Sequence, residues 1–446
     1  MDDYTPRQVV SLLDRYIIGQ EDAKKSVAIA LRNRWRRRHA AGDMKDEIVP
    51  NNIIMIGPTG VGKTEIARRL AKMVNAPFVK VEASNYTEVG YVGRDVETII
   101  RDLVEISVGL VKEEHREQMH DKVEASTENR LVDLLMPDSS AKLADNDEET
   151  QARRERTREK LRAKLSAGEL EERKVTLKSS GGPSPMIEIF SRGGTDDMGI
   201  QFPGNFNPFG QQPPKERELT ISQAREQIRN EEANRMMDME KIVHEAKERA
   251  QTNGIVFIDE IDKIAGNSSQ TGPDVSREGV QRDLLPIVEG CSVNTRHGVV
   301  RTDHVLFIAA GAFNVAKPSE LIPEFQGRFP IRVELSSLGQ REFVRILKEP
   351  ENSLIKQYEA MLATEGCSLE VTEDGIEEIA RVAAEANSRA ENIGARRLRT
   401  VLSTLLEETM FEQPESGETR VKFDGEDVKE KLDGILADED LSRYIL

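Results

Sequence analysis

Short apolar runs separated by longer amphipathic stretches set the pattern of this chain. Four runs, at residues 52–57, 77–82, 254–260 and 305–310, are rich in Ile, Val, Phe and Ala. Runs of this length are typical of strands buried within a sheet. Because helical stretches lie between them, we expect an α/β fold with a parallel sheet covered by helices on both faces.

The first helices carry recognisable boundary residues. Thr5 followed by Pro6 is a cap residue before a first-turn proline, so a helix is expected to begin there. We expect this helix to break at residues 17–20. A second helix should run from Glu21 into the basic run of residues 32–38.

Residues 110–243 differ in character from the rest and predict an inserted domain. Residues 145–178 are dominated by Glu, Arg and Lys, which favours a solvated helix. Residues 193–214 hold Gly, Asn, Gln and Pro, which are typical of a loop. Another charged helix is expected near residues 220–250.

After residue 330 we expect the chain to become helical again and to include a short strand at residues 420–423. Three domains follow from these patterns. The expected boundaries are 1–109 with 244–332 for a discontinuous sheet domain, 110–243 for the insertion, and 333–446 for a smaller, mainly helical C-terminal domain.

Composition narrows the class of protein. The 446 residues include 63 Lys and Arg against 80 Asp and Glu, which gives a formal net charge of −17, and only 4% are aromatic. Heavy charge with few aromatic residues favours long solvated helices. The acidity argues against nucleic acid as the main partner.

The N-terminus and the cysteines bear on the compartment. The chain begins Met1-Asp2-Asp3, which is acidic where a signal peptide is basic and then apolar. Cys291 and Cys367 are too few for a disulfide framework or a zinc site. No apolar run approaches the ~18 residues of a membrane span. We therefore expect a cytoplasmic protein with no membrane partner.

A glycine-rich loop follows the first apolar run. Residues 57–64 read Gly-Pro-Thr-Gly-Val-Gly-Lys-Thr and fit the pattern G-x-x-x-x-G-K-[ST]. The glycines let backbone N–H groups turn toward phosphate oxygens, and the following helix directs its positive end to the same place. Lys63 can reach the β- and γ-phosphates, and the Thr64 hydroxyl can bind Mg²⁺. The loop predicts a nucleoside triphosphate site.

Two acidic residues end the third apolar run. Asp259 should emerge at the carboxyl end of a central strand, where α/β sheets bind ligands, and can hold Mg²⁺ through water. Glu260 is placed to orient and deprotonate an attacking water. ATP is favoured over GTP because no Asn-Lys-x-Asp guanine-binding tetrapeptide occurs.

Two arginines complete a phosphoryl-transfer set. Arg328 lies within residues 323–330 and Arg396 within residues 394–397. An arginine that reaches the γ-phosphate stabilises transition-state charge and is worth about 10³–10⁵ in rate. Taken alone, either residue is more typical of a surface ion pair.

Seven segments, in order and spacing, resemble one family. They are Tyr16-Ile17-Ile18-Gly19-Gln20, residues 57–65, Gly90-Tyr91-Val92-Gly93, residues 257–260, residues 323–330, residues 394–396 and residues 441–446. Together they are similar to AAA+ ATPases and, more narrowly, to the HslU (ClpY) family, which unfolds proteins for a separate peptidase. The resemblance covers nearly the whole chain and implies an AAA+ nucleotide-binding core, an inserted intermediate domain and a small C-terminal domain. It also implies a homohexamer, ATP and Mg²⁺ as cofactors, and an HslV-like peptidase and protein substrates as partners.

The resemblance implies a role for each matching residue. These roles are adenine packing for Ile18; phosphate binding for Gly60, Val61, Gly62, Lys63, Thr64 and Glu65; Mg²⁺ binding for Thr64 and Asp259; water activation for Glu260; contact with a neighbouring subunit's nucleotide for Glu324 and Arg328; and nucleotide sensing for Arg396. The fourth run departs from the superfamily pattern, because residues 309–312 lack the usual Asn or Thr sensor of the γ-phosphate. Asn314 is a weak candidate for that role.

Tyr91 and Val92 lie between two glycines, so the Tyr91 ring can swing on a hinged loop. Six such rings would line the axial pore of a hexamer and grip a chain of any sequence by apolar contact. The alternative is a core tyrosine on a tight turn.

The chain ends in Arg443, Tyr444, Ile445 and Leu446, an apolar terminus after an acidic stretch. Such an end favours burial in a pocket, and we expect it to dock on the peptidase. The alternative is packing on its own small domain.

Several alternatives stay open on sequence alone. The basic run at residues 32–38 could bind a phosphate backbone, form a solvated helix end or pair with acidic surface. The protein could be a ClpX-like unfoldase, although it lacks a paired Cys-x-x-Cys module, or an AAA+ nucleic-acid motor, although its net charge is negative. A nucleotide-gated scaffold with little turnover is disfavoured by Glu260 and Arg328. The sequence shows no H-E-x-x-H motif or nucleophile elbow, so we expect an ATPase without its own peptidase site.

Overall fold

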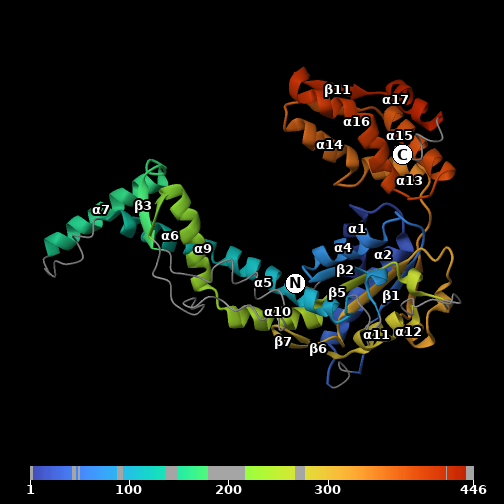
Figure 1. Ribbon diagram of the computed structural model, residues 1–446, viewed down its shortest axis with the longest axis horizontal. Coiled ribbons are helices and arrows are strands. Elements are labelled where there is room, and N and C mark those ends of the chain that lie inside the picture. The colour runs from blue at the N-terminus through green and yellow to red at the C-terminus, as the bar shows by residue number, and fades with distance from the viewer. Residues whose placement is uncertain are drawn as a thin grey trace, which may run out of the picture. The chain divides into compact units, whose positions relative to one another are not determined.

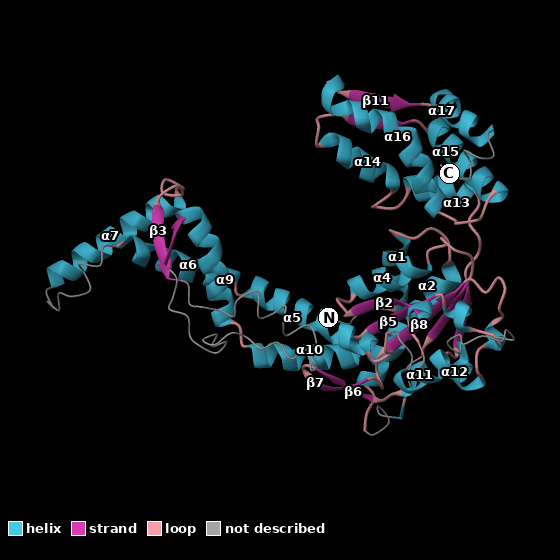
Figure 2. Ribbon diagram, viewed as in Figure 1, coloured by secondary structure: helices cyan, strands magenta, loops and turns pink. Residues whose placement is uncertain are grey.

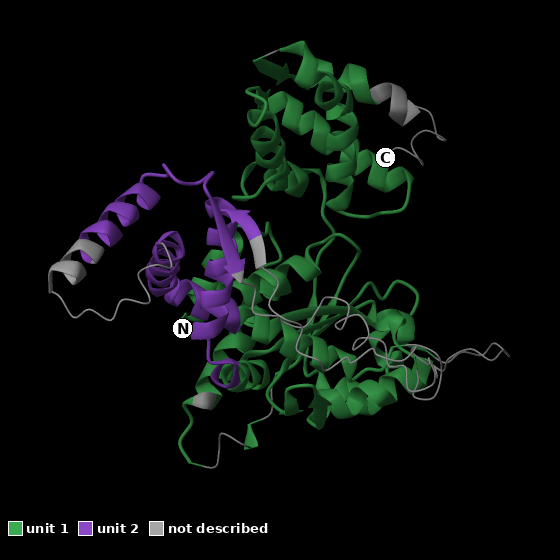
Figure 3. Cartoon of the chain, turned by 60° about the vertical axis from the view of Figure 1, so that its left-hand side comes forward, with its two compact units in different colours: residues 1–110, 243–446 green, residues 111–242 purple. Residues whose placement is uncertain are grey.

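The computed structural model describes residues 4–42, 47–48, 51–87, 94–136, 148–178, 216–266, 277–417 and 419–437. The chain divides into two compact units, which Figure 3 colours separately. Unit 1 holds residues 1–110 and 243–446, and unit 2 holds residues 111–242.

A parallel sheet forms the centre of unit 1 (Figure 2). Its strands in the described residues are β1 (Ile53–Ile56), β2 (Phe78–Glu82), β5 (Ile255–Asp259), β8 (Leu306–Gly311) and β9 (Ile331–Glu334). They lie in the order β2-β5-β8-β1-β9. Ile53 is in register with Ile308 on one side and Ile331 on the other. Because every pairing is parallel, all carboxyl ends of the strands meet at one edge, where α/β sheets bind ligands.

The four strands expected from apolar runs are confirmed, and β9 is an addition. We expected helix after residue 330, and this is wrong for the four residues of β9. Only Val333 of this edge strand is buried. Four residues with one buried side chain give too short an alternation to stand out in the sequence.

Helices cover the sheet, and Figure 1 labels them along the chain. Those that lie wholly in unit 1 are α1 (Pro6–Asp14), α2 (Glu21–Arg38), α4 (Lys63–Met73), α11 (Arg277–Glu289) and α12 (Pro323–Arg328). Two further helices, α5 (Thr98–Gln118) and α10 (Met239–Asn253), run across the boundary with unit 2. Short 3₁₀ turns lie at Ala83–Asn85, Ile261–Ile264 and Pro318–Glu320, and a hairpin joins β6 (Ser292–Thr295) to β7 (Gly298–Arg301). The expected start of α1 is confirmed, because the Thr5 hydroxyl accepts the Gln8 N–H at 3.3 Å. Buried Leu13, Leu70 and Phe257 belong to the core that the helices form with the sheet.

The C-terminal part of unit 1 has its own core. Its elements are α13 (Gln340–Lys348), α14 (Leu354–Ala363), β10 (Ser368–Val371), α15 (Glu373–Arg389), α16 (Arg396–Ser416), β11 (Arg420–Phe423) and α17 (Gly425–Ala437). Phe343, Val382 and Leu402 are fully or almost fully buried in one cluster. The mainly helical character and the strand at 420–423 are confirmed. That strand pairs in parallel with β10, which the sequence did not reveal.

Unit 2 is helical with a small antiparallel pair of strands. Its elements are α6 (His120–Leu135), α7 (Glu148–Ser166), β3 (Lys174–Lys178), β4 (Glu216–Thr220) and α9 (Ile221–Met236). Leu131, Leu165 and Ile228 lie in its core. The single helix expected over 145–178 is wrong beyond Ser166, because the chain turns at Gly168 and becomes β3. The charged helix expected near 220–250 is two helices, α9 and α10. The expected loop at 193–214 lies outside the described residues.

Candidate active site

The glycine loop joins β1 to α4 at the carboxyl edge of the sheet (Figure 1). Gly57 N–H donates to Gly311 O of β8 at 3.2 Å, and a Cβ on Gly57 would meet Leu335 O at 2.6 Å. Gly60 and Gly62 adopt φ values of 76° and 103°. The loop therefore needs glycine at Gly57 because another segment approaches closely, and at Gly60 and Gly62 because the backbone is left-handed.

Lys63 is the first residue of α4 and is 8% exposed. Its ammonium donates to Pro58 O at 2.9 Å, a carbonyl of the loop itself. Burial lowers the pKa of Lys63, the carboxylates of Asp259 and Asp262 oppose this, and the charge of Arg396 adds to it. A buried ammonium held by carbonyls alone gains from an anionic ligand, and phosphate oxygens would supply it.

Thr64 and Asp259 come together from α4 and β5. The Thr64 hydroxyl donates to Asp259 Oδ2 at 3.4 Å, and Lys80 of β2 places its ammonium 3.2 Å from the same oxygen. Mg²⁺ prefers carboxylate and other oxygen ligands beside substrate phosphates. The donor set therefore fits a magnesium ion, with Thr64 and Asp259 as the residues that would hold it.

Glu260 follows β5 with a left-handed φ of 56°. Its Oε2 lies 3.2 Å from the Ser84 hydroxyl and 3.1 Å from the Lys263 ammonium. The side chain is 38% exposed, so its carboxylate is held by neighbours and open to water. This arrangement suits a base that acts on a water molecule.

Glu65 and Val61 contribute differently from their neighbours in the loop. The carboxylate of Glu65 pairs with Arg68 and, at 2.7 Å, with Arg69 on the same helix. Burial opposes ionisation of Glu65, but these two bonds outweigh it and lower the pKa of Glu65. Val61 is buried in the core. Because both side chains are occupied, their backbone N–H groups are what they offer a phosphate.

Residues 17–20 form the expected break between α1 and α2, with Ile18 buried. The Gln20 amide exchanges two hydrogen bonds with the backbone of Ser336, at 2.8 and 3.0 Å. The Tyr16 hydroxyl donates to Glu351 Oε2 at 2.9 Å. The segment is thereby tied to the chain that enters and leaves α13.

Helix α16 begins against the glycine loop. Ala395 N–H donates to Gly60 O at 3.1 Å, and a Cβ on Gly60 would lie 1.9 Å from Ile393 O. Arg396 is the first residue of α16 and is exposed, and its charge helps to lower the pKa of Lys63. The expected sensor arginine therefore lies within electrostatic range of the phosphate-loop lysine.

Asn387 holds the turn before α16, and sequence reasoning missed it. Its amide nitrogen donates to Gly394 O at 3.1 Å, and its oxygen accepts Ile393 N–H at 3.2 Å. Buried Arg397 donates to the same oxygen at 3.3 Å and to Glu391 O at 2.8 Å. Asn387 lies on a helix with no motif around it, so only its buried position could have marked it.

The predicted pair Glu324 and Arg328 lies on α12. Phe325 of this helix and Phe329, the residue after it, are buried, with ring centroids 4.9 Å apart. Glu324 is exposed, and Arg328 Nε donates to Glu289 Oε1 of α11 at 2.9 Å. Among the described contacts, none joins Arg328 to the glycine loop of its own chain.

The remaining predicted site residues divide into two groups. Asn314 is exposed, three residues beyond β8. The others lie outside the described residues: Tyr91, Val92, Arg443, Tyr444, Ile445 and Leu446.

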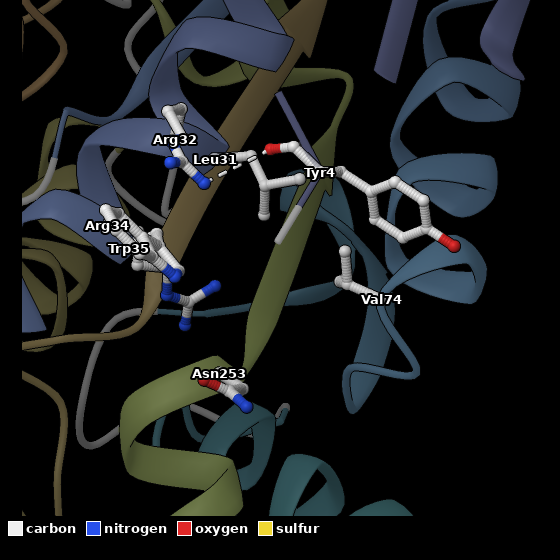
Figure 4. A pocket seen from close by; sticks show the side chains of 7 residues that line it. All are labelled: Tyr4, Leu31, Arg32, Arg34, Trp35, Val74 and Asn253. Atoms are coloured by element: carbon white, nitrogen blue, oxygen red, sulfur yellow. Dashed lines mark hydrogen bonds between the residues drawn. The ribbon is translucent and has the colours of Figure 1, made fainter. Parts of the chain in front are cut away.

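The basic run at the end of α2 is only partly packed against the rest of the chain. Arg34 Nη2 donates to Gly254 O at 2.9 Å and to His304 O at 3.2 Å, and the Arg32 guanidinium lies 3.7 Å from the ring centroid of Trp35 on the same helix. The expectation of a solvated helix end is therefore wrong for Arg34, whereas Arg36 is exposed. Figure 4 shows a hollow beside this run, lined by Tyr4, Leu31, Arg32, Arg34, Trp35, Val74 and Asn253. It lies near the amino ends of β5 and β8, away from the glycine loop.

Two kinds of feature are absent from the described residues. None of the described helices combines the length and apolar character needed to cross a membrane. Within the same ranges, His, Cys, Asp and Glu form no group of three that could ligate a metal.

Three sequence families match successive parts of the chain. The ATPase family associated with various cellular activities (AAA) matches residues 53–177, and the AAA domain of the Cdc48 subfamily matches residues 198–332. The C-terminal, D2-small domain of ClpB protein matches residues 338–429.

Similar proteins cover the chain from end to end. The ATP-dependent protease ATPase subunit HslU of Thermotoga petrophila is 53% identical over 460 aligned residues, which cover 100% of this chain and 99% of that protein. The subunit of the same name from Oleidesulfovibrio alaskensis is 52% identical and covers 99% of both chains. That of Myxococcus xanthus is 52% identical and covers 100% of both.

Proposed function

This chain belongs to the HslU family of ATP-dependent protease ATPase subunits, and from this premise we propose that it unfolds protein substrates and passes them to a separate, HslV-like peptidase. The chain is an ATPase and binds nucleotide. We propose further that it works with Mg²⁺, as a cytoplasmic homohexamer. The functional division would be a nucleotide-binding domain of 1–109 with 244–332, an inserted domain of 110–243 and a small domain of 333–446.

The proposed roles follow the contacts at the carboxyl edge of the sheet. Lys63 and the loop N–H groups bind phosphates, Thr64 and Asp259 hold Mg²⁺, and Glu260 deprotonates water. Ile18 packs on adenine and Arg396 senses the nucleotide. Glu324 and Arg328 face a neighbouring subunit's nucleotide. When bound, Mg²⁺ would neutralise phosphate charge in the transition state.

One observation carries the proposal of mechanical work. The bond from Ala395 N–H to Gly60 O joins the phosphate loop directly to the first turn of α16. The backbone there is so close that Gly60 has no room for a side chain. A nucleotide that rearranges the loop must therefore move or strain the start of α16. This contact offers a route from phosphate binding to movement of the small domain, which a motor needs and a static scaffold does not.

The test is reconstitution with a peptidase. The purified chain is mixed with an HslV-type peptidase and a stably folded, fluorescent substrate, with ATP, with a non-hydrolysable analogue or without nucleotide. We expect loss of native fluorescence and appearance of peptides only with ATP. An unfolded version of the substrate serves as the control for peptidase activation alone. ATP turnover without loss of the folded substrate would contradict the unfoldase proposal.

The nucleic-acid motor is the alternative to exclude in the same experiment. A basic surface at the end of α2 would lack Arg34, whose guanidinium donates to Gly254 O and His304 O. ATP turnover is therefore measured with added single- and double-stranded DNA. Stimulation by DNA and not by protein substrate would favour the motor.

A further inference from the structure

The main chain of Arg328 is fixed to the sheet by a buried amide. Asn52, which precedes β1, is 2% exposed and donates from Nδ2 to Arg328 O at 3.0 Å. The Asn52 side-chain oxygen accepts the Phe307 N–H of β8 at 3.0 Å, and its main-chain oxygen accepts Ile331 N–H at 3.4 Å. The end of α12 is thus joined to the beginnings of β8 and β9. The starting point of the Arg328 side chain has little freedom.

A second buried amide fixes α11 against α12. Gln281 of α11 is 1% exposed, and its oxygen accepts Ile322 N–H, just before α12, at 2.8 Å. Its nitrogen donates to Ile264 O at 2.6 Å. Glu289, the last residue of α11, is therefore carried on a helix whose position relative to α12 is set by buried hydrogen bonds.

Glu289, held in this position by α11, bonds only the Nε edge of the Arg328 guanidinium. Glu289 Oε1 accepts from Nε at 2.9 Å, and the side chains are 37% and 39% exposed. Among the described contacts, none occupies either Nη nitrogen of Arg328. A planar guanidinium held at Nε still presents its two Nη groups, which are the atoms that bind phosphate in bidentate fashion.

We propose that Glu289 is a positioning residue for ATP hydrolysis: it orients Arg328 so that both Nη groups point toward the phosphates of a neighbouring subunit's nucleotide. This inference rests on the proposed role of Arg328. Asn52 sets where the side chain begins, and Glu289 sets where it points. Misplacement of a catalytic group by about 1 Å costs up to 10²-fold in rate. Loss of Glu289 should therefore cost less than the 10³–10⁵ expected for loss of the arginine itself.

Substitutions of Glu289 test the proposal in the full-length protein. We expect Glu289→Ala to lower kcat roughly tenfold with KM for ATP unchanged, because orientation and not nucleotide affinity is lost. Glu289→Gln keeps an acceptor without the charge and should lie between Ala and the parent. Glu278→Ala is the matched control, because Glu278 pairs with Arg282 on the same helix and is similarly exposed. It should leave kcat unchanged, and all three variants should melt and assemble alike.

A double-mutant cycle separates orientation from general damage. In an Arg328→Lys background, which lacks the Nε contact, adding Glu289→Ala should lower kcat no further. If Glu289→Ala lowers kcat as much in the Arg328→Lys background as in the parent, the proposal is wrong. It is also wrong if Glu289→Ala keeps the parental kcat while Arg328→Ala has lost turnover. If Arg328→Ala itself keeps parental turnover, the proposed role of Arg328 fails and this inference with it.

Discussion

At the scale of single residues, Lys63 and Glu260 divide nucleotide binding from chemistry. Lys63 is buried, its pKa is lowered mainly by burial, and its contacts are carbonyls of its own loop. Glu260 is accessible and held by a hydroxyl and an ammonium. The first side chain is suited to hold charge that is already present on the ligand. The second is suited to take a proton from water.

Lys63→Thr should weaken ATP binding by roughly 10²-fold, because the phosphates lose a charge-assisted hydrogen bond. Glu260→Gln should bind ATP like the parent and lose about 10²–10⁴ in kcat, because an amide keeps the shape but cannot act as a base. Calorimetric Kd and phosphate release measure the two effects. Parental turnover by the Gln variant would remove Glu260 from the chemical step.

Tyr91→Ala should keep ATP turnover and fail to unfold folded substrates, because the proposed loss is of grip and not of chemistry. Tyr91→Phe should be mild, since the ring makes the apolar contact. Phosphate release and loss of substrate fluorescence are measured on the same samples. Equal unfolding by the Ala variant would favour the alternative of a core tyrosine.

At the scale of elements, the phosphate loop and the start of α16 are in direct contact. Gly60 and Gly62 both need left-handed backbone, but only Gly60 approaches another segment. That segment is held by two side chains: Asn387 accepts the Ile393 N–H, and Arg397 donates to Glu391 O. The loop is therefore constrained by its own conformation and by the small-domain chain that rests on it.

Gly60→Ala and Gly62→Ala form a matched pair for this contact. Each carries backbone strain of about 1–3 kcal/mol, because alanine disfavours left-handed φ. Only at Gly60 does the new Cβ collide with Ile393 O, at 1.9 Å, whereas nothing lies within 4 Å of a Cβ at Gly62. We expect Gly60→Ala to weaken nucleotide binding more than Gly62→Ala does. We also expect it to increase proteolysis of residues 336–339, which lie between β9 and α13. Equal effects of the two substitutions would show that the contact with α16 does not matter.

Motifs with fixed spacing located the parts of the site that lie on one stretch of chain or at a strand end. Lys63, Thr64 and Asp259 could be named from the sequence because a glycine loop and an apolar strand end mark them. In the structure the Thr64 hydroxyl donates to Asp259, and the charge of Asp259 acts on the pKa of Lys63. Asn52 and Glu289 could not be named in this way. Their partners lie 276 and 39 residues away, and no periodic pattern records such a pairing.

The same limit applies to the elements. Four strands were predicted because they are buried runs, whereas β9 and β10 are four residues long and incompletely buried. In unit 2 the charged composition correctly favoured helix for α7. It gave no sign of where β3 begins, because Lys and Glu continue across the boundary at Gly168.

At the scale of the whole molecule, the proposed ring makes each active site depend on two chains. Arg328 is bonded to Glu289 and not to its own glycine loop in the described contacts. An arginine placed in this way is useful when a second copy brings its nucleotide to it. Subunit assembly would then be a condition for hydrolysis.

Mixing two inactive variants tests this dependence. Arg328→Ala and Glu260→Gln should each be inactive alone, because one lacks the arginine and the other the base. In mixed rings, some junctions combine an intact Glu260 with an intact Arg328 from the neighbour, so part of the phosphate release should return. Arg328→Ala and Lys63→Thr chains are a second pair that should regain phosphate release when mixed in one ring, because some junctions combine an intact Lys63 with an intact Arg328 from the neighbour. No recovery in rings verified as mixed would show that Arg328 acts within its own chain.

Docking to the peptidase is proposed for the apolar residues 444–446. These residues are Tyr, Ile and Leu, and they follow an acidic stretch that favours solvent. Exposed apolar side chains beside such a stretch favour burial in a pocket of a partner. Deletion of 444–446 should therefore keep ATP turnover and hexamers while abolishing activation of the peptidase.

The deletion needs a control that keeps the length of the chain. Replacement of Tyr444, Ile445 and Leu446 by serines provides it, and it should fail like the deletion, because apolar burial is lost. A synthetic peptide of the last ten residues should partly activate the peptidase in the absence of the ATPase, whereas a scrambled peptide should not. Cleavage of a fluorogenic peptide measures all four cases. If the truncated chain still stimulated cleavage at the parental level, docking would have to be sought elsewhere, with the insertion of residues 110–243 as the next surface to test.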